Sequence, residues 1–206
     1  MTEQLLKTFI IFFVVIEPVS LVPMFGALTR GGEPGYRKKM AFKSIAISAA
    51  IFIVFALAGD WLLRLLGISV SAFKIAGGIL LFLLAVDMVL ARESGLRSTT
   101  VREQDEARYR EDISVFPMAF PLITGPGALA TMLLLTAGAA DWIGVGLVLA
   151  MGLLALAVTL VMLLLTQPLM RVIGVTGGSV ISRLLGVVLS ALAAQYVVDG
   201  ITEVLV

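Results

Sequence analysis

Six apolar runs, each long enough to cross a lipid bilayer, leave this chain few choices of fold. A transmembrane helix needs about 20 apolar residues, and only helices or closed barrels satisfy all their backbone hydrogen bonds within lipid. Runs of this length indicate helices. We therefore predict an all-α polytopic membrane protein with six transmembrane helices. The runs cover residues 5–28, 41–60, 72–91, 114–138, 143–166 and 180–202.

Composition agrees with a chain that lies in a membrane. Of its 206 residues, 60% are hydrophobic and 14% are charged, and its mean hydropathy of +1.08 is far above that of soluble domains. The first apolar run begins close to Met1, outlasts a signal-peptide core and has no small-residue cleavage site after it. We therefore expect this run to be the first span.

Two residue types that serve much enzyme and metal chemistry are missing. The chain has no Cys and no His, which excludes thiolate and imidazole metal sites, Ser-His and Cys-His catalysis, and histidine proton relays. It also has no phosphate-binding loop of the GxxxxGKS or GxxxxGKT type, so ATP does not drive it directly. We predict a protein that is not an enzyme and has no cofactor, metal or nucleic acid partner.

Basic residues predict the orientation of the spans. Twelve of the 15 Lys and Arg residues lie on the side of the loops that follow the first, third and fifth spans. Because basic loops stay in the cytoplasm, we predict a prokaryotic plasma (inner) membrane protein with both N- and C-termini outside. The charged segment 92–113 is expected to be a solvated cytoplasmic loop. The twelve are Arg30, Arg37, Lys38, Lys39, Lys43, Arg92, Arg97, Arg102, Arg108, Arg110, Arg171 and Arg183.

The two halves of the chain resemble each other. The stretch P-VSLV-P (18–23) has the same proline spacing as P-LITG-P (121–126), and LLRLLGIS (62–69) aligns with LMRVIGVT (169–176). Landmarks in the same order indicate an internal repeat, although apolar segments share residues by chance as well.

We predict one transmembrane domain over residues 1–206, in which two repeats flank the polar loop 92–113. Repeat 1 covers residues 1–91 and repeat 2 covers residues 114–206. Each repeat has three spans, an odd number, so the second enters the membrane from the opposite side and the repeats are inverted. Inverted repeats are the geometry of alternating access in transporters.

The paired prolines predict that helices 1 and 4 are broken. Each proline removes one backbone hydrogen bond, and we expect the turn between Pro18 and Pro23, like that between Pro121 and Pro126, to unwind. Such backbone is tolerated at membrane depth only where protein buries it or water lines it. The alternative is a pair of kinks that only shape the packing.

The second break offers hydrogen-bond donors for a carboxylate. Gly125 and Gly127 flank Pro126, Thr124 adds a hydroxyl, and a half-helix that starts near Pro126 would aim its amide N–H groups at the break. In the first break, Ser20 lies between the prolines. The pattern favours a binding site at the two breaks.

Glu17 lies inside the first span, where a charged residue costs about 2.5–3.5 kcal/mol on insertion scales. It can cap the broken turn, bind a substrate ammonium, or carry a coupling proton. These roles stay open. Among the other intramembrane residues, Gln195 and Asp199 share one helix face and are candidates for coupling or gating. Gly77 and Gly78 provide either close helix contact or room for a small substrate.

The stretches IEPVSLVPMF, SAFKIAGGILL, FPLITGPGA and SRLLGVVLSALAAQYVVDGI occur in that order around a polar loop. They resemble the MarC family of six-helix membrane proteins, which includes small neutral amino acid transporters. The resemblance covers nearly the whole chain. It implies transport of glycine and alanine by a bundle with broken first and fourth helices, and it implies site residues by position. These are Glu17, Pro18, Ser20, Pro23, Thr124, Gly125, Pro126 and Gly127.

Our leading hypothesis is a secondary transporter of small neutral amino acids, with proton coupling through Glu17 left open. Its expected partners are that substrate and the lipid bilayer, and a homo-oligomer is not excluded. Competing hypotheses are an exporter of other small metabolites or drugs, an intramembrane enzyme that uses Asp87 or Asp199, and a scaffold that transports nothing. The family often has Asp or Asn at Glu17 and Gly at Ser20, which leaves the substrate size open.

Overall fold

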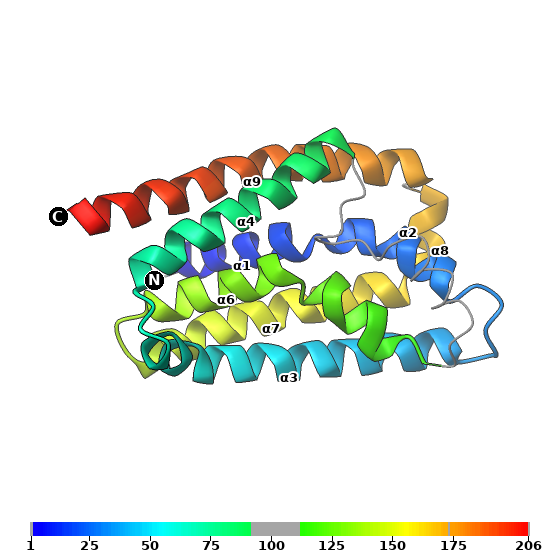
Figure 1. Cartoon of the computed structure of the whole chain (residues 1–206). Helices are drawn as coiled ribbons and strands as arrows, with labels where there is room; N and C mark the ends of the chain where they lie inside the picture. The colour runs from blue at the N-terminus through cyan, green and yellow to red at the C-terminus, as the bar shows by residue number, and fades with distance from the viewer. Residues whose placement is uncertain (1, 92–111, 173, 206) are drawn as a thin grey trace.

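The computed structural model describes residues 2–91, 112–172 and 174–205 (Figure 1). Within these ranges every regular element is a helix. The all-α architecture is therefore confirmed. Most of the loop predicted at 92–113 lies outside the described residues.

Six spans account for the helices of the described residues except the short α8, and the first and fourth spans are each made of two helices. Five stretches are long and apolar enough to cross a membrane, and the sixth is a pair of helices, η1 and α6, bent by 58°. This agrees with the six predicted spans and with breaks in the first and fourth. The elements are α1 (Thr2–Ile16), α2 (Pro18–Leu28), α3 (Tyr36–Leu65), α4 (Val70–Leu90), η1 (Ser114–Ile123), α6 (Pro126–Ala137), α7 (Trp142–Leu164), α8 (Thr166–Val172) and α9 (Gly174–Leu205).

Local chemistry explains where several helices begin. The Asp141 carboxylate accepts the N–H of Gly144 at 2.7 Å and begins α7, and the Ser69 hydroxyl accepts the N–H of Ala72 at 3.1 Å and begins α4. Gly35, just before α3, has a φ of 89°, which glycine adopts without steric cost.

Successive spans run in alternate directions, so the first spans of the two halves point opposite ways (Figure 1). Both chain ends lie on one side of the bundle. Contacts between the halves are matched: α3 packs on η1 and α6, as α7 packs on α2 and α1, and α4 contacts α6, as α9 contacts α1 and α2. Two inverted repeats would give this pattern, and nothing in the contacts conflicts with that prediction. The boundaries at residues 91 and 114 stay a prediction.

The third and sixth spans, α4 and α9, lie against each other along much of their length (Figure 1). A Cβ on Gly78 would come within 2.8 Å of the Ala193 carbonyl oxygen, and one on Gly200 within 2.8 Å of the Ser71 carbonyl oxygen. Gly186 is crowded in the same way. Only glycine permits this backbone approach, as is common between transmembrane helices.

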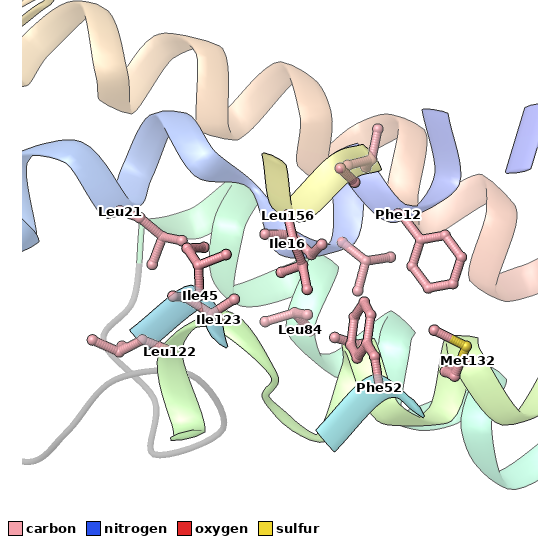
Figure 2. Packing of buried hydrophobic residues seen from close by; sticks show 14 of the residues in the cluster. Phe12, Ile16, Leu21, Ile45, Phe52, Leu84, Leu122, Ile123, Met132 and Leu156 are labelled. Atoms are coloured by element: carbon pink, nitrogen blue, oxygen red, sulfur yellow. The ribbon is translucent and has the colours of Figure 1, made fainter. Parts of the chain in front are cut away.

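The apolar core lies between the two halves, on both sides of the breaks (Figure 2). The rings of Phe12 and Phe52 have centroids 5.5 Å apart and are tilted by 44°. Met132 packs beside Phe52, where Gly152 leaves room for both. Many large apolar side chains also face outward, as expected of helices that contact lipid.

The two sides of the bundle carry different polar groups. On the side of the chain ends, Trp61 and Trp142 are 63% and 74% exposed, as in the aromatic belts at bilayer surfaces. On the other side, Lys43 of α3 forms an ion pair with Asp112, just before η1. Hydrogen bonds from Lys43 and Ser114 lower the pKa of Asp112 to about 2, which keeps its carboxylate charged.

Candidate substrate site at two helix breaks

The first break is a single residue, Glu17, between α1 and α2. The residue before a proline is driven out of the helical region by the proline ring, and Glu17 adopts φ 50° and ψ 60° before Pro18. A left-handed conformation costs a residue other than glycine about 1–3 kcal/mol. The Glu17 N–H still completes α1 by donating to the Phe13 carbonyl at 2.9 Å.

The Glu17 side chain is 2% exposed, and its carboxylate accepts the Ser20 hydroxyl at 2.5 Å. This bond holds the carboxylate beside the first turn of α2, where the helix dipole favours negative charge. Hydrogen bonding of this kind also orients the group. The first break therefore presents a fixed, buried carboxylate.

The prediction that the turn between Pro18 and Pro23 unwinds is wrong. Residues 18 to 28 form the continuous helix α2, with Pro23 inside it. Pro18 occupies the first helical position, where its missing N–H has no partner to lose. The break thus falls before the first proline and leaves the second in helical backbone.

The second break is longer and covers Thr124 and Gly125, between η1 and α6. Phe116 and Phe120 within η1 also depart from helical angles, with Phe120 at φ −132° and ψ 130°. The Ala119 carbonyl accepts both the N–H and the hydroxyl of Thr124, at 2.8 and 2.6 Å. Here the expected loss of helix between the prolines 121 and 126 is confined to residues 124 and 125, because 121–123 stay within η1.

The N-terminus of α6 receives no hydrogen bond from the side chain of its N-cap residue. Its N-cap residue is Gly125, whose Cβ, if present, would lie 2.5 Å from the Pro121 carbonyl oxygen. Glycine is needed for this approach. The amide N–H groups of the first turn, at Gly127 and Ala128, consequently face no capping oxygen from the N-cap side chain.

The two breaks meet through α1 and α6. A Cβ on Gly127 would lie 3.6 Å from Val15 and 3.0 Å from Leu84. A pocket of about 10 Å³ lies between these residues and the turn 121–125, which is close to the smallest volume that holds one water molecule. This pocket, which we call the central pocket, is too small to hold an amino acid.

The other predicted site residues lie farther away. Pro23 packs beside Leu169 and Met170 of α8. Gly77 contacts Leu134 of α6, and Gly78 contacts α9. The sequence allowed either close helix contact or room for a small substrate at these glycines, and these contacts fit the first role. Gln195 and Asp199 are joined by a hydrogen bond of 2.6 Å at the far end of α9.

Sequence reasoning missed a large cavity on the side of the chain ends. It has a volume of about 450 Å³ and is lined by parts of α1, α4, α6, α7 and α9. We call it the terminal cavity. A second cavity of about 540 Å³ lies beside it, between α3 and the loop before α7. Neither could be found from one sequence, because each needs helices that are distant in the chain.

Two buried aliphatic hydroxyls inside the bundle also have no hydrogen-bond partner among the described residues. They belong to Ser48 of α3 and Thr131 of α6, both fully buried. Ser44 and Thr136 of the same helices instead donate to carbonyls of the preceding turn, at 2.8 Å. No sequence signal distinguishes the two kinds, because all four are small hydroxyls within apolar runs.

Comparison with known proteins covers the whole chain. The sequence profile described as "MarC family integral membrane protein" matches residues 2–205. A UPF0056 membrane protein of Methanocaldococcus jannaschii is 36% identical over 200 residues, which make up 97% of this chain and 96% of that protein. No solved structure matches.

Two bacterial proteins show similar agreement. The UPF0056 membrane protein YvbG of Bacillus subtilis is 33% identical over 208 residues, 98% of this chain and 95% of that protein. The UPF0056 inner membrane protein YhgN of Escherichia coli is 30% identical over 199 residues, 97% of this chain and 96% of that protein. These matches include both helix breaks, and the chain belongs to the MarC family of integral membrane proteins.

Proposed function

We propose that this protein is a secondary transporter of small neutral amino acids, with glycine and alanine as substrates. One observation carries the proposal: a buried carboxylate at one helix break and an uncapped helix N-terminus at the other lie on contacting, oppositely directed spans. Glu17 supplies the carboxylate and α6 supplies the N-terminus. A zwitterion needs an acceptor for its ammonium and donors for its carboxylate, and these two groups supply both.

In this proposal the substrate ammonium binds Glu17 and its carboxylate binds the first turn of α6. The positive end of the α6 dipole favours the negative group. The walls limit size, because Leu84 and Leu81 already lie 3.0 and 3.2 Å from the place of a Cβ on Gly127. Glycine and alanine fit this restriction better than branched or aromatic amino acids.

The closed pocket corresponds to an intermediate of alternating access. Each of α1, α4 and α6 lines both this pocket and the terminal cavity, for example Gly127 and Leu134 of α6. Seven residues of helix separate these two, or about 10 Å at 1.5 Å per residue. Buried residues fill the interval, namely Phe12, Leu81 and Thr131. Movement of this layer would connect the pocket to the terminal cavity.

Orientation and coupling complete the proposal. The protein lies in the prokaryotic plasma membrane with both termini outside, supported by the basic residues of the opposite loops and by the E. coli relative, which is named an inner membrane protein. The terminal cavity then faces outward. Glu17 carries the coupling proton by changing charge between states.

Uptake into proteoliposomes tests the proposal. Labelled glycine is followed with and without a pH gradient for the wild type, Glu17→Gln, and Glu3→Gln, which makes the same change at an exposed position of α1. We expect gradient-driven accumulation in the wild type and Glu3→Gln, and its loss in Glu17→Gln. Absence of saturable uptake of any small amino acid by folded wild-type protein would refute the function.

A further inference from the structure

The terminal cavity is large enough for a ligand of its own. Its volume of about 450 Å³ lies within the range of small-molecule sites, whereas the central pocket at about 10 Å³ has no such room. Five helices from both halves of the chain form its wall. It is therefore a recess among several helices, open at exposed residues such as Gln4 and Asp141, and not a groove along one helix pair.

Charged groups of both signs line the wall. Lys74 of α4 has a side chain only 18% exposed and forms an ion pair with Glu203 of α9. Asp199 of α9 also lines the cavity and accepts the Gln195 amide at 2.6 Å. An apolar lipid chain is a poor occupant for such a wall, because it offers no polar group to the charged side chains there.

Tyr196 lines the same wall, three positions before Asp199 and so on the same face of α9. Its hydroxyl is buried and has no hydrogen-bond partner among the described residues. Buried polar atoms are nearly always paired, so each exception needs an explanation. A phenol hydroxyl that can donate and accept beside a cavity lined by Lys74, Asp141 and Asp199 points to a bound polar ligand.

We propose that the terminal cavity is a second binding site for a zwitterionic amino acid. The ligand ammonium binds Asp199, its carboxylate binds Lys74 in competition with Glu203, and Tyr196 gains its missing hydrogen bond. The substrate would bind here on its way to the central pocket, and in that role the site rests on the proposed transport function. The neighbouring cavity of about 540 Å³ differs from it, because none of the described residues that line it has a buried hydroxyl without a partner, and its Asp60 and Arg64 pair with each other at 2.8 Å.

The chain's three tyrosines allow a site-specific test. Full-length protein in lipid nanodiscs is labelled with 3-fluorotyrosine, and its ¹⁹F spectrum is followed during titration with glycine. Tyr196→Phe assigns the reporter signal. Tyr36 is the first residue of α3 and serves as an internal reference, because α3 begins on the side of the bundle opposite the chain ends (Figure 1). Propionate and methylamine, each carrying one charged group of the zwitterion, are the matched control ligands.

We expect a saturable shift of the Tyr196 signal with glycine, little shift with either control ligand, and its loss in Asp199→Asn and in Lys74→Gln. The shift should persist in Glu17→Gln, which alters only the central site. Asp60→Asn, in the neighbouring cavity, should behave as wild type. A thermal melt of each variant shows which ones are folded.

Three results would overturn the proposal. They are no Tyr196 shift with glycine in the wild type, an equal shift with propionate or methylamine alone, and a shift that vanishes in Glu17→Gln because it only reports the central site. Uptake measured on the same preparations separates the two ideas. Saturable glycine uptake without a Tyr196 shift removes the second site and leaves the transport function standing.

Discussion

The two helix breaks differ in length, charge and cause, although their prolines have the same spacing. The first is one strained residue, Glu17, which comes before the first proline of its pair. The second is two residues, Thr124 and Gly125, which come before the second proline of its pair. One break supplies a carboxylate and the other supplies backbone donors. In the proposed function, this difference suits a substrate whose two ends carry opposite charges.

The largest effect is expected at Gly125. In Gly125→Ala the new Cβ would meet the Pro121 carbonyl oxygen at 2.5 Å, and backbone cannot yield as a flexible side chain does. We expect transport to fall more than tenfold and the melting temperature to drop. Uptake assays and thermal melts check this. Gly146→Ala, where nothing lies within 4 Å, should keep both. Normal uptake in Gly125→Ala would show that the second break needs no close backbone approach.

Ser20→Ala tests whether the first break orients a substrate-binding carboxylate. Hydrogen bonds to charged groups are worth about 1.5–3 kcal/mol, and 1.4 kcal/mol corresponds to about tenfold in affinity. We expect the glycine concentration for half-maximal uptake to rise about tenfold. Ser190→Ala removes a comparable hydroxyl, bonded to the Val187 carbonyl on exposed α9, and should change nothing. A lower melting temperature with unchanged uptake would make Glu17 a structural cap.

Gly127→Ala should change substrate preference more than rate. Its Cβ would lie 3.0 Å from the end of Leu84 and 3.2 Å from that of Leu81, and overpacking of this kind costs about 1–3 kcal/mol. We expect uptake of alanine to weaken several-fold relative to glycine, in a competition assay. Gly77→Ala is equally crowded, at 3.1 Å from Leu134, but it lies away from the breaks. If it changed the preference equally, the effect would not be local.

The smallest effect is expected at Pro23, which lies in helical α2 next to α8. Pro23→Ala restores an N–H that can donate to the Val19 carbonyl. We expect uptake within twofold of the wild type and an equal or higher melting temperature. A tenfold loss of uptake would mean that Pro23, the second proline of the first pair, also shapes the site.

The sequence predicts much of this fold for clear physical reasons. Each apolar run, and each motif that repeats between the two halves, consists of residues close together in the chain. For this reason the six spans and the broken first and fourth helices could be predicted. The position of the first break could not. Both Pro18 and Pro23 disrupt helices in isolation, and only the packing of α2 against α7, α8 and α9 decides that helix resumes at Pro18 and continues past Pro23.

The site was predicted less completely than the fold. Thr124, Gly125, Pro126 and Gly127 lie together because they are adjacent in the chain. Contact of Val15 and Leu84 with that turn depends on three different helices, which sequence spacing does not encode. Lys74 and Asp199 lie on α4 and α9, which belong to different halves of the chain. Sequence spacing therefore could not predict that they line one cavity.

The glycine contacts between α4 and α9 hold these two helices close together along their length. Gly78, Gly186 and Gly200 bring the two backbones together at three levels along their length, so neither helix can slide past the other without steric collision. In the proposed transport cycle we therefore expect α4 and α9 to act as a frame, with one member contributed by each half. The broken spans would move against this frame, and Leu81 of α4 would change only its side-chain position.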